Sequence, residues 1–325
     1  MATMKDVAKA CGVGVATVSY ALNGSDQVSE ETRNKILKVA EEMGYVPNSF
    51  ARSLKKQKTM RVGIFVTDFA GPIRPAILNG ITKGFANTEY HVIVTPVYDE
   101  MTLIKDKSVD LAIIMDQRIS EEKIIELAEY SKIIVYDNKN IMNEDVYQVL
   151  LQNESAIYNE TKHLIELGIK KIAFLLGPSI SWHNFERYQG YLKAMSEANL
   201  KTLVYDVNSF DEAASYQYMK KVLNGVTKLP FEAAVCSNDE LAFGLINVLK
   251  KNHFKVPADC LVAGFDNVDK ACLIDPPLTT IHIDWDKCGR IMANMALDIL
   301  SGKEINKKVT IPAELVIRKS TEINK

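Results

Sequence analysis

Hydrophobic and polar positions follow two different patterns along the chain, and the change falls near residue 61. Before that point, apolar residues recur at helical spacing in three short segments that glycines separate. After it, short continuous apolar runs such as residues 62–66, Leu111–Met115 and Ile172–Leu176 alternate with amphipathic stretches. The first pattern predicts a small helical domain. The second predicts parallel strands that are covered by helices on both faces.

The first sixty residues predict three helices. The first starts after Thr3, because its hydroxyl and the acid Asp6 form a capping pair, and Gly12 ends it. A tight turn over residues 12–14 leads into a second helix over residues 15–22. The third helix starts at Ser29 and ends at Gly44, and its predicted apolar stripe is Ile36, Leu37, Val39, Ala40 and Met43. Three short helices with a three-residue turn between the first two form a helix-turn-helix arrangement.

The second helix has an unusual outward side. Helical spacing places the apolar residues Val18, Ala21 and Leu22 on one side. The opposite side carries Ala16, Ser19 and Tyr20, with Val15 at the leading end. A large aromatic among small residues is suited to contact a partner, and the alternative is that Tyr20 only packs on its neighbours.

Residues 48–55 predict a further helix of only about two turns. Pro47 ends the preceding structure, and Asn48 or Ser49 could cap a new helix. A helix this short is not stable alone in water, so it must fold against a partner or stay disordered. The alternative is a plain flexible linker in which Leu54 has no role.

The remaining chain predicts an α/β body of two lobes. Its strand runs are too many for one sheet of usual size, so we expect two sheets with chain crossings near residues 152, 282 and 311. Ligands of such sheets bind at the carboxyl ends of the strands, here between the lobes. The expected strands are residues 62–66, 91–94, 111–115, 133–136, 172–176, 233–236 and 261–265, and helices are expected over residues 73–87 and 285–300.

Composition narrows the class of protein. The 325 residues are 47% hydrophobic and 25% charged, which is typical of an ordinary globular chain. No apolar run is long enough to span a bilayer and no secretory signal is visible, so we expect a cytoplasmic protein. The five cysteines have no metal-site spacing, so we expect buried free thiols and no metal site, and the candidates are Cys11, Cys236, Cys260, Cys272 and Cys288.

Charge is distributed unevenly. Residues 1–61 carry ten Lys and Arg against six acids, a balance of +4, whereas the rest of the chain carries −6. A basic head on an acidic body favours a polyanion partner for the head. The asymmetry alone does not identify that partner.

The chain resembles the lactose-repressor/galactose-repressor family of bacterial transcription regulators over nearly its full length. The matching segments are residues 4–8 (MKDVA), 16–19 (ATVS), 21–23 (ALN), 28–33 (VSEETR), 44–48 (GYVPN), 51–54 (ARSL), 238–242 (NDELA), 264–267 (GFDN) and 276–281 (PPLTTI). The resemblance implies a helix-turn-helix DNA-binding domain (1–47) and a hinge helix with its linker (48–60). It also implies a two-lobe, doubly wound parallel-sheet domain like periplasmic binding proteins (61–325) for effector binding and dimerisation.

The resemblance also implies which residues contact DNA. Val15, Ala16 and Tyr20 take the base-reading positions in the major groove, and Thr17 and Ser19 contact phosphates. Tyr20 stands where arginine is common in this family. An arginine would donate two hydrogen bonds to guanine, whereas the ring of Tyr20 would pack against a thymine methyl. Gly14 replaces a usual capping serine, at a cost of a few tenths of a kcal/mol. The other implied contacts are Thr3, Asn23, Ser29, Thr32, Tyr45, Asn48, Ala51, Arg52, Leu54 and Lys55.

Residues 48–55 correspond to the hinge helix of this family. Paired with its copy in a dimer, the hinge helix lies in the minor groove and places Leu54 between base steps, which kinks the duplex. Arg52 and Lys55, followed by Lys56 and Lys58, then serve phosphates. The hinge would form only when dimer and DNA supply its partners.

The implied effector site lies between the two lobes. Carboxylates and amides would bind the hydroxyls of a sugar, an arginine would bind paired oxygens, and an aromatic wall would cover its apolar face. The implied contacts are Asp68, Ile73, Asp137, Trp182, His183, Arg187, Phe210, Asn238 and Asp266. Two features depart from the family pattern. Ile283 stands where some members have a polar group, and the segment of residues 95–110 is shorter than the helical crossover of relatives.

The expected function is therefore that of a repressor of carbohydrate-use genes that binds a pseudo-palindromic operator as a homodimer. A dimer is expected rather than a tetramer, because no leucine-heptad tail follows the body. The alternatives are a nucleobase or nucleoside effector, a co-repressor or activator, a solute-binding protein and a doubly wound enzyme. No nucleotide, hydrolase or metal motif supports an enzyme, so we expect no catalytic residue, no cofactor and no metal.

Overall fold

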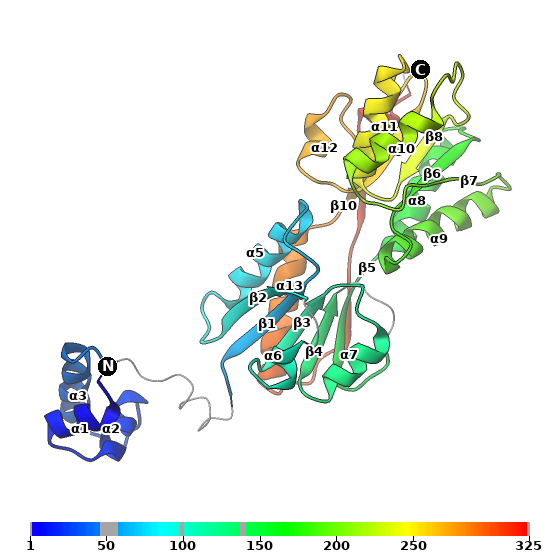
Figure 1. The fold of residues 1–325 in the computed structure, drawn as a ribbon. Coiled ribbons are helices and arrows are strands. Elements are labelled where there is room, and N and C mark those ends of the chain that lie inside the picture. The colour runs from blue at the N-terminus through cyan, green and yellow to red at the C-terminus, as the bar shows by residue number, and fades with distance from the viewer. Residues whose placement is uncertain (1, 46–57, 98–100, 137–140, 324–325) are drawn as a thin grey trace. The chain divides into compact units, whose positions relative to one another are not determined.

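The computed structural model describes residues 2–45, 58–97, 101–136 and 141–323. The chain divides into two compact units, Met1–Thr59 and Met60–Lys325 (Figure 1). We call the first unit the head and the second the body. Among the described helices, none is long and apolar enough to cross a membrane.

The head contains three helices, α1 (Met4–Cys11), α2 (Val15–Leu22) and α3 (Glu30–Glu42). At the start of α1, the Thr3 hydroxyl accepts from the Asp6 N–H while the Asp6 carboxylate accepts from the Thr3 N–H, which completes the predicted capping pair. The hydroxyl of Ser29 caps α3 by accepting from the Thr32 N–H. The buried core of the head is Val7, Ala8, Cys11, Val18, Ala21, Val28, Ile36 and Ala40.

The apolar stripe predicted for α3 is wrong at two positions. Ile36 and Ala40 are buried, but Leu37 and Met43 are exposed by 43% and 36%. Leu37 follows Ile36 directly, so a helical turn of about 100° carries its side chain out of the core. A helix of this length in so small a domain buries only a narrow face.

The first lobe of the body has a six-stranded parallel sheet in the order β11-β5-β4-β3-β1-β2. Successive residues of β3 point to opposite faces. Ile113 and Met115 pack in the core with α5 and α13, whereas Ala112 and Ile114 pack with α6 and α7. The elements are β1 Arg61–Val66, α5 Ile73–Phe85, β2 His91–Pro96, α6 Thr102–Lys105, β3 Leu111–Met115, α7 Glu121–Ala128, β4 Lys132–Tyr136, β5 Val146–Leu151, α13 Trp285–Leu300 and β11 Lys308–Ile311.

The second lobe repeats this architecture in the order β12-β10-β9-β8-β6-β7, with β12 antiparallel to β10. Phe174 of β6 faces the core that α8 and α9 cover, and Leu175 faces the core under α10 and α11. The elements are α8 Asn153–Glu166, β6 Ile172–Leu176, α9 Trp182–Glu197, β7 Leu203–Asp206, α10 Glu212–Val222, β8 Ala233–Cys236, α11 Asp239–Lys251, β9 Leu261–Asp266, α12 Lys270–Leu273, β10 Thr279–His282, β12 Glu314–Val316 and the 3₁₀ helix η1 Lys319–Thr321.

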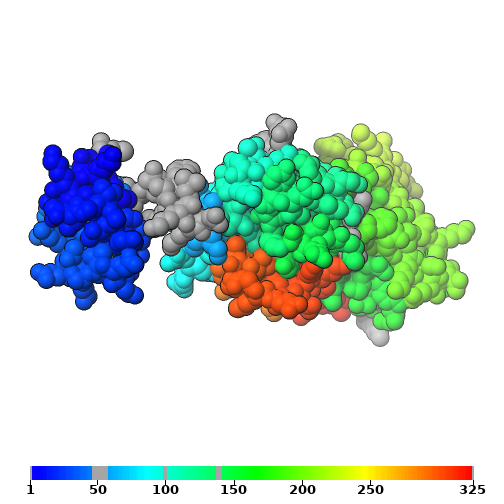
Figure 2. All heavy atoms as spheres, turned by 90° about the horizontal axis from the view of Figure 1, so that it is seen from below, coloured from blue at the N-terminus to red at the C-terminus, as the bar shows by residue number. Residues whose placement is uncertain are grey.

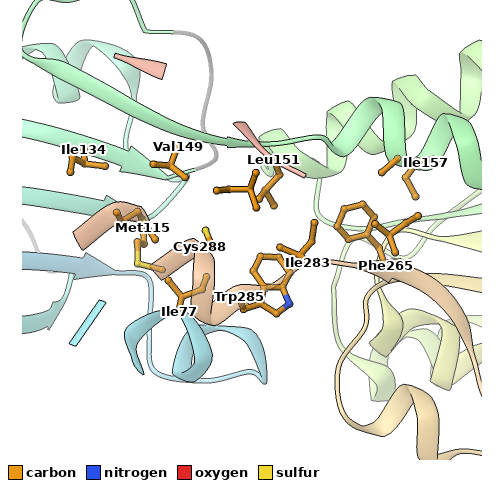
Figure 3. Close-up of a cluster of buried hydrophobic side chains, with 14 of the residues drawn as sticks. Ile77, Met115, Ile134, Val149, Leu151, Ile157, Phe265, Ile283, Trp285 and Cys288 are labelled. Carbon is orange, nitrogen blue, oxygen red and sulfur yellow. The ribbon is translucent and has the colours of Figure 1, made fainter. Parts of the chain in front are cut away.

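The chain passes between the lobes after β5, after β10 and between β11 and β12. One apolar cluster runs through these crossings (Figure 3), from Met115 and Val149 of the first lobe through Trp285 to Phe265 of the second. Ile283 is buried in this cluster. Continuous burial of apolar side chains joins the two lobes at their connections.

Helices α5 and α13 cross at unusually close range. A Cβ added to Gly289 would lie 2.1 Å from the carbonyl oxygen of Ile77, and one added to Gly80 would lie 2.0 Å from that of Asp286. Only glycine allows this approach. Part of helix α13 is exposed on the surface of the first lobe, where it is coloured orange (Figure 2).

One expectation about cysteine is also wrong. Cys11, Cys236, Cys260 and Cys288 are buried free thiols, but Cys272 is exposed. Cys272 lies in the one-turn helix α12, which is too short to bury its whole circumference.

Candidate functional site

The head presents one face of α2 to solvent. Val15 and Tyr20 are exposed by 41% and 37%, and Ala16 is also exposed. Val18 and Ala21 are buried against α1 and α3. The exposed face therefore combines a branched apolar group, a methyl group and a phenol, which suits it to contact base edges and thymine methyls.

Thr17 and Ser19 flank this face and are half-buried. The Asn23 side chain donates to the Ser19 carbonyl over 2.7 Å, which ties the end of α2 together. Gly14 caps α2 without a side-chain hydrogen bond. The N–H groups of the first turn of α2 are therefore not taken by a capping side chain, and such groups can bind a phosphate.

The other predicted DNA contacts of the head also have hydrogen-bonding or packing partners within the head. The hydroxyls of Thr3 and Ser29 belong to the caps of α1 and α3, Ser29 donates to Thr32 over 2.9 Å, and Tyr45 packs against the head core. Five predicted contacts lie outside the described residues: Asn48, Ala51, Arg52, Leu54 and Lys55.

In the body, candidate residues gather where strand order reverses. The first sheet reverses between β1 and β3, and the second reverses between β6 and β8. Ligands of doubly wound sheets bind outside the carboxyl ends of strands at such points. Residues 67–68 and 116–118 follow β1 and β3, and residues 177 and 237–238 follow β6 and β8.

Arg187 of α9 is the best-held charged group in this region. Its side chain is 3% exposed, and it donates from Nε to Asn153 Oδ1 over 2.9 Å and from Nη1 to the Ser237 carbonyl over 2.7 Å. Its guanidinium carbon lies 3.6 Å from the centre of the Phe265 ring. These contacts fix the plane of the guanidinium, so the fork is oriented before any ligand arrives.

Asp266 faces Arg187 across 3.7 Å and is also buried. Its backbone has φ of 114°, a conformation that a non-glycine residue adopts only under strain, and its carbonyl accepts from Trp285 Nε1 over 3.0 Å. Burial and the charge of Asp266 raise the pKa of the neighbouring Asp239 well above its usual value. Strain held in place by such contacts is typical of functional sites.

Two stacked aromatic pairs involve residues of the first turn of α9. The rings of His183 and Phe210 stack with centroids 5.2 Å apart, and those of Trp182 and Phe185 stack at 5.1 Å. Gly177 makes room for Phe210, because a Cβ there would lie 2.4 Å from the phenyl ring. Aromatic surface beside a charged fork suits a ligand with both polar edges and an apolar face.

His183 is neutral in this environment. Desolvation, and then the positive charges of Arg187 and Arg74, hold its pKa well below the usual value. Its Nδ1 lies within hydrogen-bonding distance of the Gln117 side chain, from the first lobe. A neutral imidazole can accept at one nitrogen and donate at the other.

The first lobe supplies two carboxylate–arginine pairs. Asp68 accepts from Arg74 and from the Ala70 N–H, the latter over 2.8 Å. The Asp116 carboxylate accepts from Nε and Nη2 of Arg118. Burial raises the pKa of Asp116, but the hydrogen bonds from Arg118 outweigh burial, so the pKa lies below its usual value.

The remaining effector candidates have mixed placements. Asn238 caps α11 by accepting from the Leu241 N–H over 3.0 Å and donates to the Phe210 carbonyl over 3.1 Å. Ile73 begins α5 and packs against the apolar cluster of Figure 3. Asp137 lies outside the described residues.

Several residues that hold this region together were not among the predicted site residues, namely Asp116, Gln117, Arg118, Asn153, Asn184 and Ser237. Asn184 Oδ1 accepts from the Gly177 N–H over 2.9 Å and from the Ser237 hydroxyl over 2.6 Å, so it joins the ends of β6 and β8. The first three directly follow the strand Leu111–Met115, and the strand-end rule would have found them. Among the described residues, no group of three or more His, Cys, Asp or Glu could hold a metal ion.

Two family patterns match this chain. "Bacterial regulatory proteins, lacI family" matches residues 3–48, and "Periplasmic binding protein-like domain" matches residues 161–321. The two matches correspond to most of the head and to much of the body.

Similar proteins match over their whole length. The HTH-type transcriptional regulator RegA of Clostridium saccharobutylicum is 34% identical, over 99% of this chain and 100% of its own. The HTH-type transcriptional repressor PurR of Mannheimia succiniciproducens is 30% identical, over 99% of both chains. A crystal structure of the Lac repressor dimer bound to operator and the anti-inducer ONPF has a TM-score of 0.85 at 24% identity, covering 98% of this chain and 99% of that one.

Proposed function

Since the chain belongs to the lacI family of bacterial regulatory proteins and is a DNA-binding transcription regulator rather than an enzyme, we propose that it is a repressor whose operator affinity is set by a small sugar bound to the body. The observation that carries this proposal is that one chain has both an exposed recognition face on the head and an oriented, buried ion pair in the body. The first is the exposed face of α2 formed by Val15, Ala16 and Tyr20, and the second is the Arg187–Asp266 pair.

A sugar fits the chemistry of the body site. Neighbouring hydroxyls need a donor fork and an acceptor side by side, which Arg187 and Asp266 provide. The stacked rings of His183 and Phe210 offer an apolar wall for the face of the sugar ring. Because His183 is neutral, it adds no charge that would select an anion.

A nucleobase is the second candidate for the effector. The 30% identical relative named PurR favours this alternative. The same aromatic pairs would stack on a planar base, and the carboxylate and guanidinium would bind its edge.

The active form in this proposal is a homodimer on a pseudo-palindromic operator. The Lac repressor of similar fold was crystallised as a dimer on its operator. A dimer places two copies of α2 in successive major grooves about one helical turn apart. Residues 48–55 then act as the hinge, with Leu54 at the centre of the operator, and effector binding changes operator affinity through that segment.

Two measurements on the full chain test the proposal. Gel retardation on a palindrome selected from random DNA should show specific binding that weakens steeply with salt. A thermal-shift screen of sugars and nucleobases should find a compound that raises the melting temperature, since a ligand at 100 times its Kd stabilises by about 2.7 kcal/mol. Repeating retardation with that compound gives the sign of regulation. No specific operator, or no change of operator affinity with any stabilising compound, would refute the proposal.

Tyr20→Arg should change which operator is preferred. An arginine at this exposed position can donate two hydrogen bonds to guanine, and the phenol cannot. We expect guanine to replace another base at one symmetric position of each half-site, with discrimination of about 1–3 kcal/mol. Operator selection from random DNA measures this, with Leu37→Ala as a control on an exposed residue of α3. An unchanged selected site would show that Tyr20 does not read bases.

A further inference from the structure

Gln117 makes a contact between the two lobes. It follows the end of β3 in the first lobe, yet its side chain reaches the first turn of α9 in the second. Its Oε1 accepts from the Trp182 N–H over 3.0 Å, and its Nε2 lies within hydrogen-bonding distance of His183 Nδ1. Both ends of the carboxamide therefore contact one helix turn.

The first turn of α9 has an N–H group that needs an acceptor such as the Gln117 carboxamide oxygen. The first N–H groups of a helix have no carbonyl partner within the helix. The Ser181 hydroxyl accepts from the Asn184 N–H over 3.2 Å, which leaves the Trp182 N–H to another acceptor. Gln117 is that acceptor, so a side chain of the first lobe completes the cap of a helix in the second.

The imidazole of His183 is the partner of the Gln117 amide nitrogen, Nε2. Stacking on Phe210 fixes the ring, and the low pKa of His183 keeps it neutral. In the neutral tautomer with its proton on Nε2, His183 Nδ1 accepts a hydrogen bond, and the Gln117 amide can only donate at its Nε2. Gln117 therefore accepts from the Trp182 N–H and donates to His183 Nδ1.

Helix α9 also carries the charged group of the effector site. Arg187 lies four residues after His183, on the same side of the helix and one turn further along. A ligand on Arg187 therefore acts on the helix whose first turn Gln117 holds. The lobes are also joined by three chain crossings, by the apolar cluster of Figure 3 and by the hydrogen bond from Trp285 Nε1 to the Asp266 carbonyl.

We propose that Gln117 is a positioning residue that couples the effector site to the first lobe, by capping α9 across the lobe boundary. The inference rests on the proposed function, because it assumes that a ligand binds at Arg187. A rotation that moves the end of β3 away from the first turn of α9 separates Gln117 from both partners at once, because both contacts are made by one carboxamide. The contact thus has two discrete states, made and broken, as a coupling element requires.

Hydrogen exchange at the Trp182 amide tests the contact without any ligand. In the full-length Gln117→Ala variant, this amide should exchange about 5-fold faster, since a hydrogen bond contributes on the order of 1 kcal/mol. The matched control is Gln189→Ala, which removes a carboxamide from α9 itself and should leave exchange at Trp182 unchanged. Equal exchange at Trp182 in wild type and Gln117→Ala would overturn the inference.

Gln117→Glu gives a signature that simple loss of packing does not. A carboxylate still accepts from the Trp182 N–H, but it cannot donate to neutral His183 and instead attracts the protonated ring. The pKa of His183 should therefore rise, and protection of Trp182, corrected for intrinsic exchange, should increase as the pH falls from 8 to 6. Wild type should show no such dependence, because burial and then the charges of Arg187 and Arg74 hold the pKa of His183 well below its usual value. A flat profile in the variant would count against the His183 contact.

Operator binding tests the coupling itself. With a compound that stabilises the wild type, Gln117→Ala should still show a thermal shift, but the compound should change operator affinity at least about 10-fold less than in wild type. Undiminished coupling would overturn the inference. If no compound affects even the wild type, the proposed effector function fails instead, and the exchange experiment alone decides whether Gln117 caps α9.

Discussion

Arg187→Met should destabilise the body by about 3 kcal/mol and abolish its response to effector. The variant keeps side-chain length but leaves Asp266 buried without its cation and frees the oxygens of Asn153 and Ser237. Breaking a buried pair by removing one partner costs about 3–5 kcal/mol, and the 3.7 Å separation from Asp266 places this pair at the lower end.

Thermal unfolding of the full chain measures the first effect. A loss of about 3 kcal/mol corresponds to a fall of about 5 °C in the melting temperature of a body this large. A compound that stabilises the wild type should bind at least about 30-fold more weakly, since truncating a buried charged contact costs about 2–5 kcal/mol.

Arg290→Met is the matched control for this prediction. Arg290 also lies on a helix and pairs with a carboxylate, Asp286, but its side chain is mostly exposed. Exposed pairs of this spacing contribute about 0.3–0.5 kcal/mol, so the control should melt within about 2 °C of wild type. If Arg187→Met behaves like this control in both measurements, Arg187 neither binds effector nor orders the site.

The sequence was most informative where local composition alone determines structure. The runs Leu111–Met115, Ile172–Leu176 and Ala233–Cys236 are strands with the expected bounds, because a strand buried on both faces must be apolar throughout. Some strands that are short or contain polar residues were not predicted. β5 contains the buried Gln148, and β11 and β12 are short strands at sheet edges, so only their partners in the sheet define them as strands.

Contacts between distant segments limit what the sequence shows of the site. The motif around residues 264–267 pointed to Asp266, whose strained backbone the structure then described. Nothing near Gln117 indicates that α9 begins beside it, since 65 residues separate Gln117 from Trp182. Asn153 also contacts Arg187 only because α8 and α9 pack together. The strand-end rule can point to Gln117 as a candidate, but the partners of Gln117 and of Asn153 follow only from how distant segments of the chain pack.

Leu37 shows a different limit. Helical periodicity groups it with Ile36, and the two have similar side chains, but neighbouring residues on a helix point about 100° apart. The small core of the head covers only one of them. Periodicity gives the apolar face of a helix, while the size of the partner surface decides how wide the buried part of that face is.

Ile36→Ala should abolish operator binding although Ile36 contacts no DNA in the proposed site. Ile36 is fully buried at the centre of the head core, and truncating such a residue costs about 2–5 kcal/mol. A domain as small as Met1–Thr59 rarely has more than about 3–5 kcal/mol of stability to lose, so most molecules should have an unfolded head. Because the body is a separate compact unit, its melting temperature and its response to effector should stay within error of wild type.

Leu37→Ala separates loss of folding from loss of contact. It removes the same kind of side chain one position later, where 43% exposure limits the expected cost to about 0.5 kcal/mol. Gel retardation should therefore show wild-type operator affinity for Leu37→Ala and no specific complex for Ile36→Ala, with the helical circular dichroism of the head lost only in the latter. Equal operator affinity in the two variants would mean that the head is held by more than its own core, because the eight buried residues alone could not absorb the loss of Ile36.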